Sequence, residues 1–280
     1  MDSTQPTSPD SGSRTGFNTG FLATTIDYPT LSPEQQTETV MIDDSPIIDY
    51  THFALTLSST RKLAYWVGWN IDGTSMQLLS RTGLTFIKDP RIPDQYQAGN
   101  DLYANNRLDR GHLARRADLT WGPDTEAHQA NKDSFYFTNI TPQMDDFNQS
   151  RQAGIWGRLE NALYEDVDLD DLRCSVFAGP VFHTEDQHYR GYQIPVEYWK
   201  LILFTQDEQL KARAFLLTQD LDRLQVLMAL DEFRVYQLTV PELEERTGLT
   251  FPAPAHEADG LRLAQSGTRH PLDAVSDILW

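Results

Sequence analysis

Residues 108–160 bring together the side chains that hydrolysis of a phosphodiester bond requires. The segment opens with DRGH at residues 109–112, continues through FYFTNITPQ and DDFNQ, and ends in IWGRLE. Such a reaction needs a base for the attacking water, a cation at the leaving oxygen and positive charge on the non-bridging oxygens. Histidine suits the first task, because its ordinary pKa of about 6.5 leaves it neutral near pH 7. His112, a divalent metal held by an asparagine and the nearby arginines would supply all three.

Taken singly, these residues have ordinary structural explanations. A lone histidine such as His112 is most often a polar residue without a catalytic task, and Asn139 or Asn148 alone would be a turn or cap residue. Glu160 alone would belong to a solvated helix face. A site needs convergent groups, so the catalytic interpretation rests on their occurrence together in one segment.

Four blocks of this segment resemble the DNA/RNA non-specific endonucleases, the ββα-metal nucleases that include mitochondrial endonuclease G. The blocks are DRGH, TNITPQ at residues 138–143, Asn148-Gln149, and Trp156 with Leu159-Glu160. DRGH alone would be a weak signal, but four blocks in the family's order within about 50 residues are specific. The upstream NIDG and DPRIP and the downstream GPVF and IPVEYWK are also similar to the family, so the resemblance covers roughly residues 48–252.

The resemblance implies a general base and a metal site. His112 would activate the attacking water, and Asn139 would help to orient His112 or the waters on the metal. Asn148 would be the one direct protein ligand of a mostly hydrated Mg²⁺, with Mn²⁺ as a substitute, which fits the reluctance of Mg²⁺ to shed water. Glu160 would hold metal-bound water. The products would carry a 5′-phosphate and a 3′-hydroxyl.

The resemblance also implies roles for three charged residues around the phosphate. Arg81 would stabilise the pentacovalent phosphate, and Asp109 and Arg110 would shape the pocket. Arg91 lies near Arg81 in the sequence and competes with it for the first of these roles.

One spacing departs from the family pattern. Asn148 and Glu160 are twelve residues apart. The usual separation is about eight, and the four extra residues are close to one helical turn, which would return Glu160 to the same face. Gly154 could instead mark a loop before the helix begins. The assignment of Glu160 therefore depends on where that helix starts.

The apolar pattern along the chain predicts an α+β protein. Two β-rich stretches around the polar turn SSTR predict a hairpin within residues 52–73. Further strands are predicted at 134–138, 176–181, 199–203 and 211–217, with helices at 152–165 and 241–246. The resemblance specifies the ββα-metal nuclease fold, with a central antiparallel sheet flanked by helices and with long loops.

Composition divides the chain into four parts. Residues 1–15 are polar, with almost nothing to bury, and are predicted to be disordered. Residues 16–47 carry scattered hydrophobic residues between prolines and are predicted to form an extended arm, which is a candidate regulatory or pro-segment. Residues 48–252 would form the endonuclease domain. Residues 253–280 lack periodicity and are predicted to be a tail that is mobile or lies over the surface.

Charge and cysteine content bear on partners and location. The 280 residues carry a net charge of −18, which opposes broad affinity for nucleic acid. Residues 81–116, however, hold seven cations and four anions, a local excess of +3 that suits a phosphate site. Cys174 is the single cysteine and is predicted to be a buried hydrophobic residue. A polar N-terminus without a signal peptide favours the cytoplasm and is equally compatible with export as an effector.

The expected partners are DNA and RNA, bound without regard to sequence. An active nuclease endangers its own cell, so we expect an inhibitor, an activating protease, or use against phage or rival cells. Family members often form homodimers. No stretch approaches the roughly 20 apolar residues of a transmembrane helix, so no membrane partner is expected. Two other functions remain open: a catalytically silent binding module of the same fold and a phosphodiesterase for small nucleotides.

The remaining histidines and the aromatic residues of the hairpin receive structural interpretations. His128 is predicted to lie in a helix, His183 and His188 in a polar loop, and His52 in a strand. None has partners at the spacing of a zinc site. The aromatic residues near the hairpin are expected to be core residues: Tyr65, Trp66 and Trp69.

Overall fold

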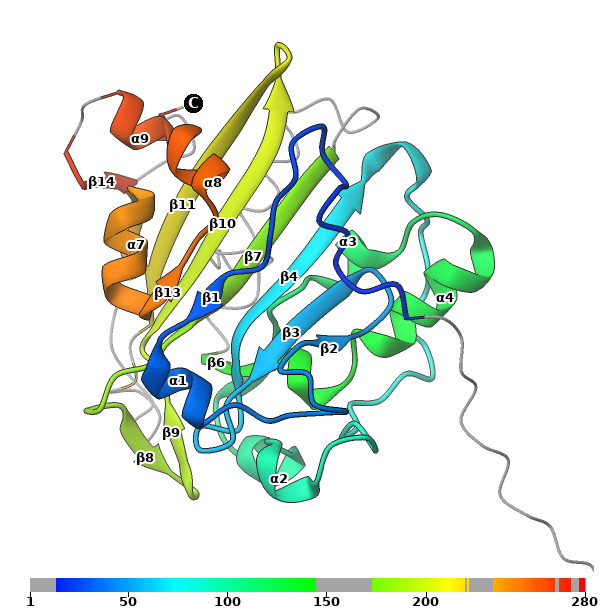
Figure 1. Ribbon diagram of the computed structural model, residues 1–280. Coiled ribbons are helices and arrows are strands. Elements are labelled where there is room, and N and C mark those ends of the chain that lie inside the picture. Colours follow the sequence, from blue (N-terminus) through cyan, green and yellow to red (C-terminus); the bar gives the residue numbers. More distant parts are fainter. Residues whose placement is uncertain are drawn as a thin grey trace, which may run out of the picture.

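A large antiparallel sheet forms the centre of the computed structural model, which describes residues 14–144, 173–219, 221, 234–264, 267–272 and 277–279 (Figure 1). The sheet has eight strands in the order β14-β12-β11-β10-β7-β4-β3-β2. In chain order its strands are β2 Ile48–Asp49, β3 Phe53–Leu57, β4 Ala64–Asp72, β7 Arg173–Val181, β10 Glu197–Gln206, β11 Gln209–Thr218, β12 Arg234–Leu238 and β14 Arg269–Leu272. The pairing of β3 with β4 around residues 58–61 confirms the predicted hairpin. The strands predicted at 176–181, 199–203 and 211–217 are confirmed as parts of β7, β10 and β11.

The central strands are buried on both faces, which explains their nearly continuous apolar sequences. In β4, Val67 and Trp69 belong to one hydrophobic cluster and Trp66 to another. Successive side chains of a strand point to opposite faces, so the sheet separates two cores. The prediction that Tyr65, Trp66 and Trp69 are core residues is confirmed, since each is at most 5% exposed. Cys174 in β7 is also buried, as predicted, and burial raises the pKa of its thiol.

One face of the sheet is covered by the N-terminal segment and by the helices that follow β12 (Figure 1). These elements are β1 Thr30–Leu31, α1 Pro33–Thr37, α7 Val240–Thr247, β13 Leu249–Thr250, α8 Ala253–Glu257 and α9 Gly260–Leu263. The helix predicted at 241–246 is confirmed as α7. Its first turn is capped by the Thr239 side chain, and it ends at Gly248, whose φ of 68° suits a residue without Cβ.

The opposite face carries the DRGH segment and its supports. A two-stranded ladder joins β5 Leu108–His112 to β6 Ile140–Met144. The surrounding elements are η1 Gly73–Ser75, η2 Asp94–Tyr96, α2 Asn100–Tyr103, α3 Arg116–Leu119, α4 Asp124–Asp133, η3 Phe137–Asn139, β8 Gln187–Tyr189 and β9 Tyr192–Ile194. Side chains from both ladder strands pack into the same core as β4 and β7, which fixes the ladder against the sheet.

Three sequence predictions about these elements were wrong. Residues 134–138 do not form a strand: α4 ends at Asp133, the chain turns, and η3 begins at Phe137, with one parallel bridge between Tyr136 and Ile87. An apolar run as short as FYF cannot distinguish a strand from a buried turn by its period. His52 lies in a bend before β3, with a φ of 69°, and His188 lies in β8 rather than in a loop. His128 lies in α4 as predicted, and His183 lies in a loop.

The two ends of the described chain also depart from expectation. Arg14 and Thr15, which we included in the disordered terminus, bond to Asp133 and to the backbone of His52. The segment 253–280, predicted to be a tail that is mobile or lies over the surface, contains α8, α9 and β14 in its described part, and β14 pairs with β12 at the edge of the sheet. Elements of four or five residues are too short to show a periodicity. None of the described helices is both long and apolar enough to span a bilayer.

Candidate active site

The ladder of β5 and β6 presents the DRGH motif. Asp109 faces Gln143 in register, Gly111 faces Thr141, and His112 faces Ile140. The Gln143 side chain lies across Gly111, where a Cβ would overlap its amide group. Glycine is therefore required at position 111 for a close approach rather than for an unusual φ. The DRGH and TPQ motifs therefore pack closely against each other, through the backbone of the ladder and through the Gln143 side chain.

His112 ends β5 with its ring against a pair of aromatic residues. The ring centroids of Phe86 and Phe135 lie 5.5 and 5.4 Å from that of the imidazole. Its Nε2 atom is buried and has no hydrogen-bond partner in the described part of the chain. Burial lowers the pKa of His112 to about 3, with further lowering from the positive charges of Arg116 and Arg81. The imidazole is therefore neutral at pH 7, as a proton acceptor must be.

Asn139 fixes the turn that follows His112. Its Oδ1 accepts a hydrogen bond from the Ala114 N–H at 2.9 Å, and its Nδ2 donates to the carbonyls of Ala114 at 3.0 Å and Ser134 at 3.1 Å. Its own carbonyl accepts from Leu113 N–H at 2.9 Å. The side chain is fully buried, and both amide hydrogens bond to backbone carbonyls. This geometry suits the orientation of His112 rather than contact with metal-bound water.

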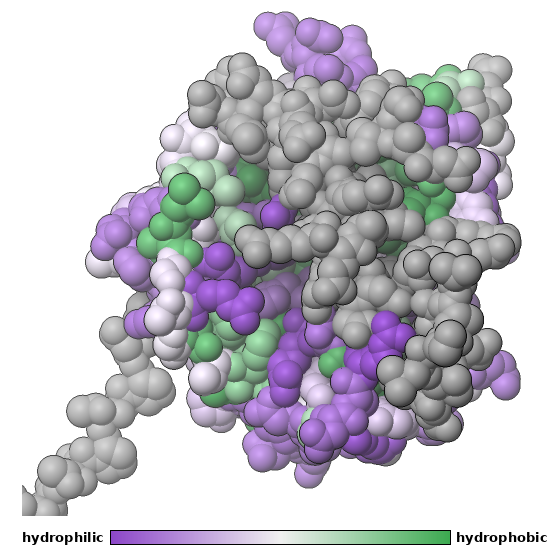
Figure 2. All heavy atoms as spheres, turned by 180° about the vertical axis from the view of Figure 1, so that it is seen from behind, coloured by the Kyte–Doolittle hydropathy of each residue, from purple (hydrophilic) through white to green (hydrophobic). Residues whose placement is uncertain are grey.

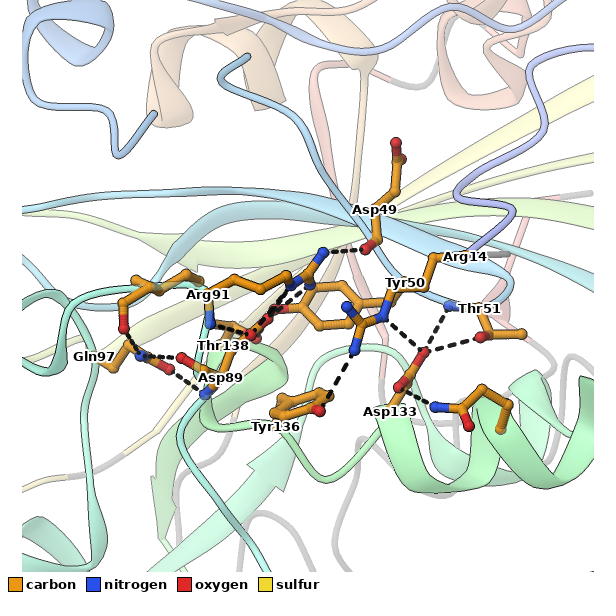
Figure 3. A network of polar contacts seen from close by, with 12 residues as sticks. Arg14, Asp49, Tyr50, Thr51, Asp89, Arg91, Gln97, Asp133, Tyr136 and Thr138 are labelled. Atoms are coloured by element: carbon orange, nitrogen blue, oxygen red, sulfur yellow. Dashed lines mark hydrogen bonds and ion pairs between the residues drawn. The ribbon is translucent and has the colours of Figure 1, made fainter. Parts of the chain in front are cut away.

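A buried polar network includes Thr138, the residue that precedes Asn139 (Figure 3). The Tyr50 hydroxyl donates to Asp89 Oδ2 at 2.6 Å, so the Thr138 hydroxyl, 2.8 Å away, donates to Tyr50. Arg91 donates to the same carboxylate at 2.6 and 3.0 Å, and its guanidinium lies 4.7 Å from the centroid of the Tyr50 ring. Burial alone would raise the pKa of Asp89, but the hydrogen bonds from Arg91 and Tyr50 outweigh it and lower that pKa. Arg91 is thus bound to the fold, which removes it as a competitor of Arg81.

A second carboxylate in the same view joins the start of the described chain to α4 (Figure 3). Asp133 Oδ2 accepts from the backbone and the hydroxyl of Thr51 at 3.0 and 2.9 Å. Arg14 Nε lies 3.6 Å from the same oxygen, and its Nη2 donates to the Tyr136 hydroxyl at 3.4 Å. The turn between α4 and η3, which leads to Asn139, is therefore held by residues from two distant parts of the sequence, Arg14 and Thr51.

Arg81 and Arg116 bring positive charge to His112. Arg81 is exposed, and Arg116 is half-buried at the start of α3. Arg116 Nη1 donates to the Leu79 carbonyl at 2.9 Å and to Asn131 Oδ1 at 3.2 Å. Burial, followed by the charges of Arg81 and Arg115, lowers the pKa of the Arg116 guanidinium. Positive charge is therefore concentrated beside the neutral imidazole.

Asp109 and Arg110 precede Gly111 on β5 and are half-buried. The Arg110 guanidinium donates to Asn100 Oδ1 at 2.8 and 3.1 Å and lies 5.0 Å from the centroid of the Tyr103 ring. These contacts with α2 hold Arg110 along the ladder, which is compatible with a role in the shape of the pocket.

Three predictions fall outside the described residues. They are Asn148 as the metal ligand, Glu160 as the residue that holds metal-bound water, and the helix at 152–165. Within the described residues, no cluster of three His, Cys, Asp or Glu side chains could hold a metal. One donor does fit: Gln143 Oε1 is buried beside Gly111 without a hydrogen-bond partner in the described chain. An amide oxygen suits a hydrated Mg²⁺ better than a soft metal.

Sequence reasoning assigned no role to Arg116, Asn131 or Gln143. The charge of Arg116 four residues after His112 was a usable signal, as was the place of Gln143 in TPQ. The bonds of Asn131 are visible only in three dimensions. The other described histidines stay structural: His52, for example, stacks on Trp121 at 3.6 Å and bonds to the Leu119 carbonyl.

Several known proteins are similar to this chain. A model of the DNA/RNA non-specific endonuclease family matches residues 34–258. The nuclease of Serratia marcescens is 31% identical over 211 residues, which cover 70% of this chain and 71% of that protein. The uncharacterized protein y4fB of Sinorhizobium fredii is 35% identical over 292 residues, which cover 95% of this chain and 42% of that protein. The chain thus spans less than half the length of this relative.

A solved structure shows the same fold. A chain in the crystal structure of the EndoG/EndoGI complex matches with a TM-score of 0.57 and 15% sequence identity. The match covers 75% of this chain and 86% of that chain. The predicted α+β class and ββα-metal nuclease fold are thereby confirmed.

Proposed function

We propose, on the premise that the chain belongs to the DNA/RNA non-specific endonuclease family, that it hydrolyses phosphodiester bonds of DNA and RNA with His112 as the general base. One observation carries the assignment: the buried Nε2 of a neutral His112 has no partner in the described chain and lies beside the charges of Arg81 and Arg116. A free acceptor nitrogen next to fixed positive charge is what an attacking water and an anionic phosphate require.

The charges around His112 make its basicity depend on the substrate. Arg116 and Arg81 disfavour the imidazolium form while the phosphate is absent. An anionic phosphate beside these guanidinium groups offsets their field, so the pKa of His112 rises towards neutrality when substrate binds. Nε2 then takes a proton from water as the water oxygen attacks phosphorus, and Arg81 stabilises the added negative charge on the non-bridging oxygens. Asn139 keeps the imidazole aligned through the Ala114 backbone.

The family is metal-dependent, and we propose Mg²⁺ as the metal, with Mn²⁺ as a substitute. Asn148 would be its direct ligand, and Glu160 and the Gln143 amide oxygen would bind its waters. When bound, the ion would neutralise charge on the leaving 3′-oxygen. The products would then be a 5′-phosphate and a 3′-hydroxyl.

Control by an inhibitor protein is the form of regulation that we propose. The related EndoG is described in a complex with EndoGI that inhibits it. Control by removal of residues 1–47 is disfavoured physically, because Phe17, Phe21, Leu22 and Ile26 of that segment are buried in the core. Loss of these side chains would expose apolar surface and destabilise the domain. Use as a toxic or anti-phage effector and assembly as a homodimer also remain proposals.

The test uses purified protein with supercoiled plasmid and, separately, single-stranded RNA. We expect cleavage of both with Mg²⁺ and none with EDTA. His112→Ala should lower the rate by about 10²–10⁴, the usual contribution of a general base. The matched control is His128→Ala, because His128 is exposed on α4 and should leave the rate unchanged. Absence of cleavage by the wild type, with nucleic acid still bound, would instead favour a catalytically silent binding module.

A further inference from the structure

Hydrogen bonds join the backbone that precedes Arg81 to the segment that follows DRGH. The Gln77 N–H donates to the Thr120 carbonyl at 2.6 Å, and the Thr120 hydroxyl donates to the Gln77 carbonyl at 2.8 Å. A bridge between Met76 and Trp121 precedes these bonds. The strip of residues 76–80 therefore lies along residues 116–122 and moves with α3.

The last two carbonyls before Arg81 are held by side chains rather than by backbone. Arg116 Nη1 donates to the Leu79 carbonyl at 2.9 Å, and Asn131 Nδ2 donates to the Ser80 carbonyl at 3.1 Å. Asn131 Oδ1 also accepts from Arg116 at 3.2 Å, which links the two side chains to each other. Asn131 is 4% exposed, so its bonds form in a place that excludes water. Arg81 is thus placed by a pair of residues from α3 and α4.

This arrangement places two guanidinium groups near each other without a carboxylate. In the described part of the chain, no ion pair joins either Arg81 or Arg116 to an acidic side chain, whereas Arg14, Arg61 and Arg91 each have one. Burial, and after it the positive charges of Arg81 and Arg115, lowers the pKa of the Arg116 guanidinium, so the charged form is disfavoured where Arg116 lies. Like charges held together at a partly buried site are relieved by an anion that bonds to both.

The face turned away from the viewer in Figure 1 is mainly hydrophilic in its described part, with smaller hydrophobic areas (Figure 2). Two exposed hydrophobic residues belong to the strip, since Met76 is 41% exposed and Leu78 lies fully exposed three residues before Arg81. Alternate side chains of the strip, those of Met76, Leu78 and Ser80, thus reach into solvent, where an extended polyanion has access, while the Leu79 and Ser80 carbonyls are held by hydrogen bonds.

We propose that Arg116 is a second phosphate-binding residue that shares a backbone phosphate of the nucleic acid with Arg81, and that Asn131 positions this pair. The proposal rests on the proposed function for the identity of the polyanion. Arg116 Nη1 serves the Leu79 carbonyl and Asn131, and the remaining guanidinium N–H groups are the donors for a phosphate oxygen. Arg81, whose own carbonyl accepts from the Leu84 N–H at 3.1 Å and whose neighbours Leu79 and Ser80 are held by Arg116 and Asn131, supplies the second set of donors.

The first experiment measures binding separately from cleavage. The probe is a short fluorescein-labelled single-stranded oligodeoxynucleotide, and its anisotropy is followed in EDTA at several salt concentrations. For Arg116→Gln we expect about tenfold weaker binding and a salt slope reduced by about one, the effect of losing one phosphate contact. Arg116→Lys should restore the slope, because the charge is kept, but not the full rate of cleavage, because the planar fork is lost.

The matched control is Arg262→Gln. Arg262 is an exposed arginine of α9 that also donates to a backbone carbonyl, that of His256, and α9 belongs to the opposite layer. Its replacement should leave binding and the salt slope unchanged. If Arg116→Gln binds with the wild-type affinity and slope, Arg116 does not contact phosphate, and the proposal is overturned.

The role of Asn131 is tested by a cycle that combines Asn131→Ala with the double variant Arg81→Ala/Arg116→Gln. Asn131→Ala alone should weaken binding, whereas its addition to the double variant should cause no further loss, because Asn131 acts through this pair of arginines. Urea unfolding of all variants separates this from a loss of stability, which would be equal in both backgrounds. Additive effects on binding would overturn the positioning role. A wild type that binds but does not cleave would contradict the proposed function and leave this cycle fully interpretable.

Discussion

The protein uses arginine in two opposite ways. In the polar network around Tyr50, Arg91 bonds to the buried carboxylate of Asp89, and Arg14 lies beside that of Asp133 (Figure 3). Near His112, Arg81 and Arg116 have no carboxylate partner in the described chain, and Arg116 bonds instead to the Leu79 carbonyl and the Asn131 amide oxygen. The first group is neutralised within the fold, and the second keeps its charge for a ligand.

Arginines that are paired with a buried carboxylate therefore contribute to stability, and arginines without such a partner contribute to function. A carboxylate at 0% exposure, such as Asp89, is strongly unfavourable unless a cation and hydrogen bonds compensate it. Removal of its partner therefore acts on folding. An exposed arginine such as Arg81 contributes little to folding, and its removal acts on the bound anion. Each prediction below tests one side of this contrast.

The largest effect is expected for Arg91→Ala, and it should be an effect on stability. The change leaves the Asp89 carboxylate buried with only the Tyr50 hydroxyl and backbone donors, which typically costs about 3–5 kcal/mol of unfolding free energy. Urea denaturation, with equal slopes for mutant and wild type, measures it. The control is Lys88→Ala, which breaks the exposed pair with Asp94 and should cost less than about 1 kcal/mol. Equal losses for the two variants would remove the distinction.

The next effect is expected for Arg81→Ala, and it should be an effect on the rate. Loss of one donor to the charged transition state lowers kcat by about 10²–10³, or roughly 2.7–4 kcal/mol. The unfolding midpoint should match that of the wild type, since the side chain is exposed. Plasmid cleavage under single-turnover conditions checks the rate. A variant with full activity and reduced stability would place Arg81 in the structural group with Arg91.

The contrast between Arg81 and Arg91 also shows where sequence reasoning stops. Both arginines lie in polar loops ten residues apart, and the motif pattern admits either as the phosphate ligand. The decision depends on Asp89, whose burial results from packing against Tyr50, a residue 39 positions away. The DRGH and TPQ motifs were predictable because their residue types are tied to one reaction. The partners that hold them were not, because they come from the rest of the fold.

The same limit explains the error at residues 134–138. The run FYF has the hydrophobicity and the β propensity of a strand. In the structure, Asn139 has to reach the Ala114 backbone, and the tight turn of η3 places it there. The large sheet could be predicted because its strands are long and apolar, as in β10 and β11. Short elements such as β14 form only because a neighbouring strand is already in place.

A smaller effect is expected for Tyr50→Phe, which probes the link between the buried network and Asn139. The change removes the hydrogen bonds to Asp89 and Thr138, each worth about 0.5–1.5 kcal/mol, so stability should fall by about 1–3 kcal/mol. The rate should fall by less than about tenfold, because Asn139 keeps its own three bonds. The control Tyr28→Phe removes a single bond to the Phe17 carbonyl and should cost about 1 kcal/mol or less. A rate loss as large as that of Arg81→Ala would make the network part of the catalytic machinery.

The smallest effect is expected for Arg116→Gln on the pH profile of kcat/KM. In the free enzyme, burial and the charges of Arg116 and Arg81 lower the pKa of His112 from 6.5 to about 3. The base is therefore neutral above that value, and activity should be lost only as the pH falls towards it. Removal of the Arg116 charge favours the imidazolium form, so the acid limb should move to higher pH. A shift of up to about one pH unit corresponds to at most about 1.4 kcal/mol.

Arg116→Lys keeps the charge and should leave the acid limb near its wild-type position. Folding stability offers a second readout with the same sign: between pH 6.5 and about 3 the unfolded chain binds a proton at His112 that the folded chain excludes. Stability should therefore decline as the pH falls through this interval, and less steeply in Arg116→Gln. An acid limb that stays at its wild-type pH in Arg116→Gln would mean that the Arg116 charge does not reach His112. Arg116 would then differ from Arg14 and Arg91 only in its bonding partners, and it would have no influence on the protonation of His112.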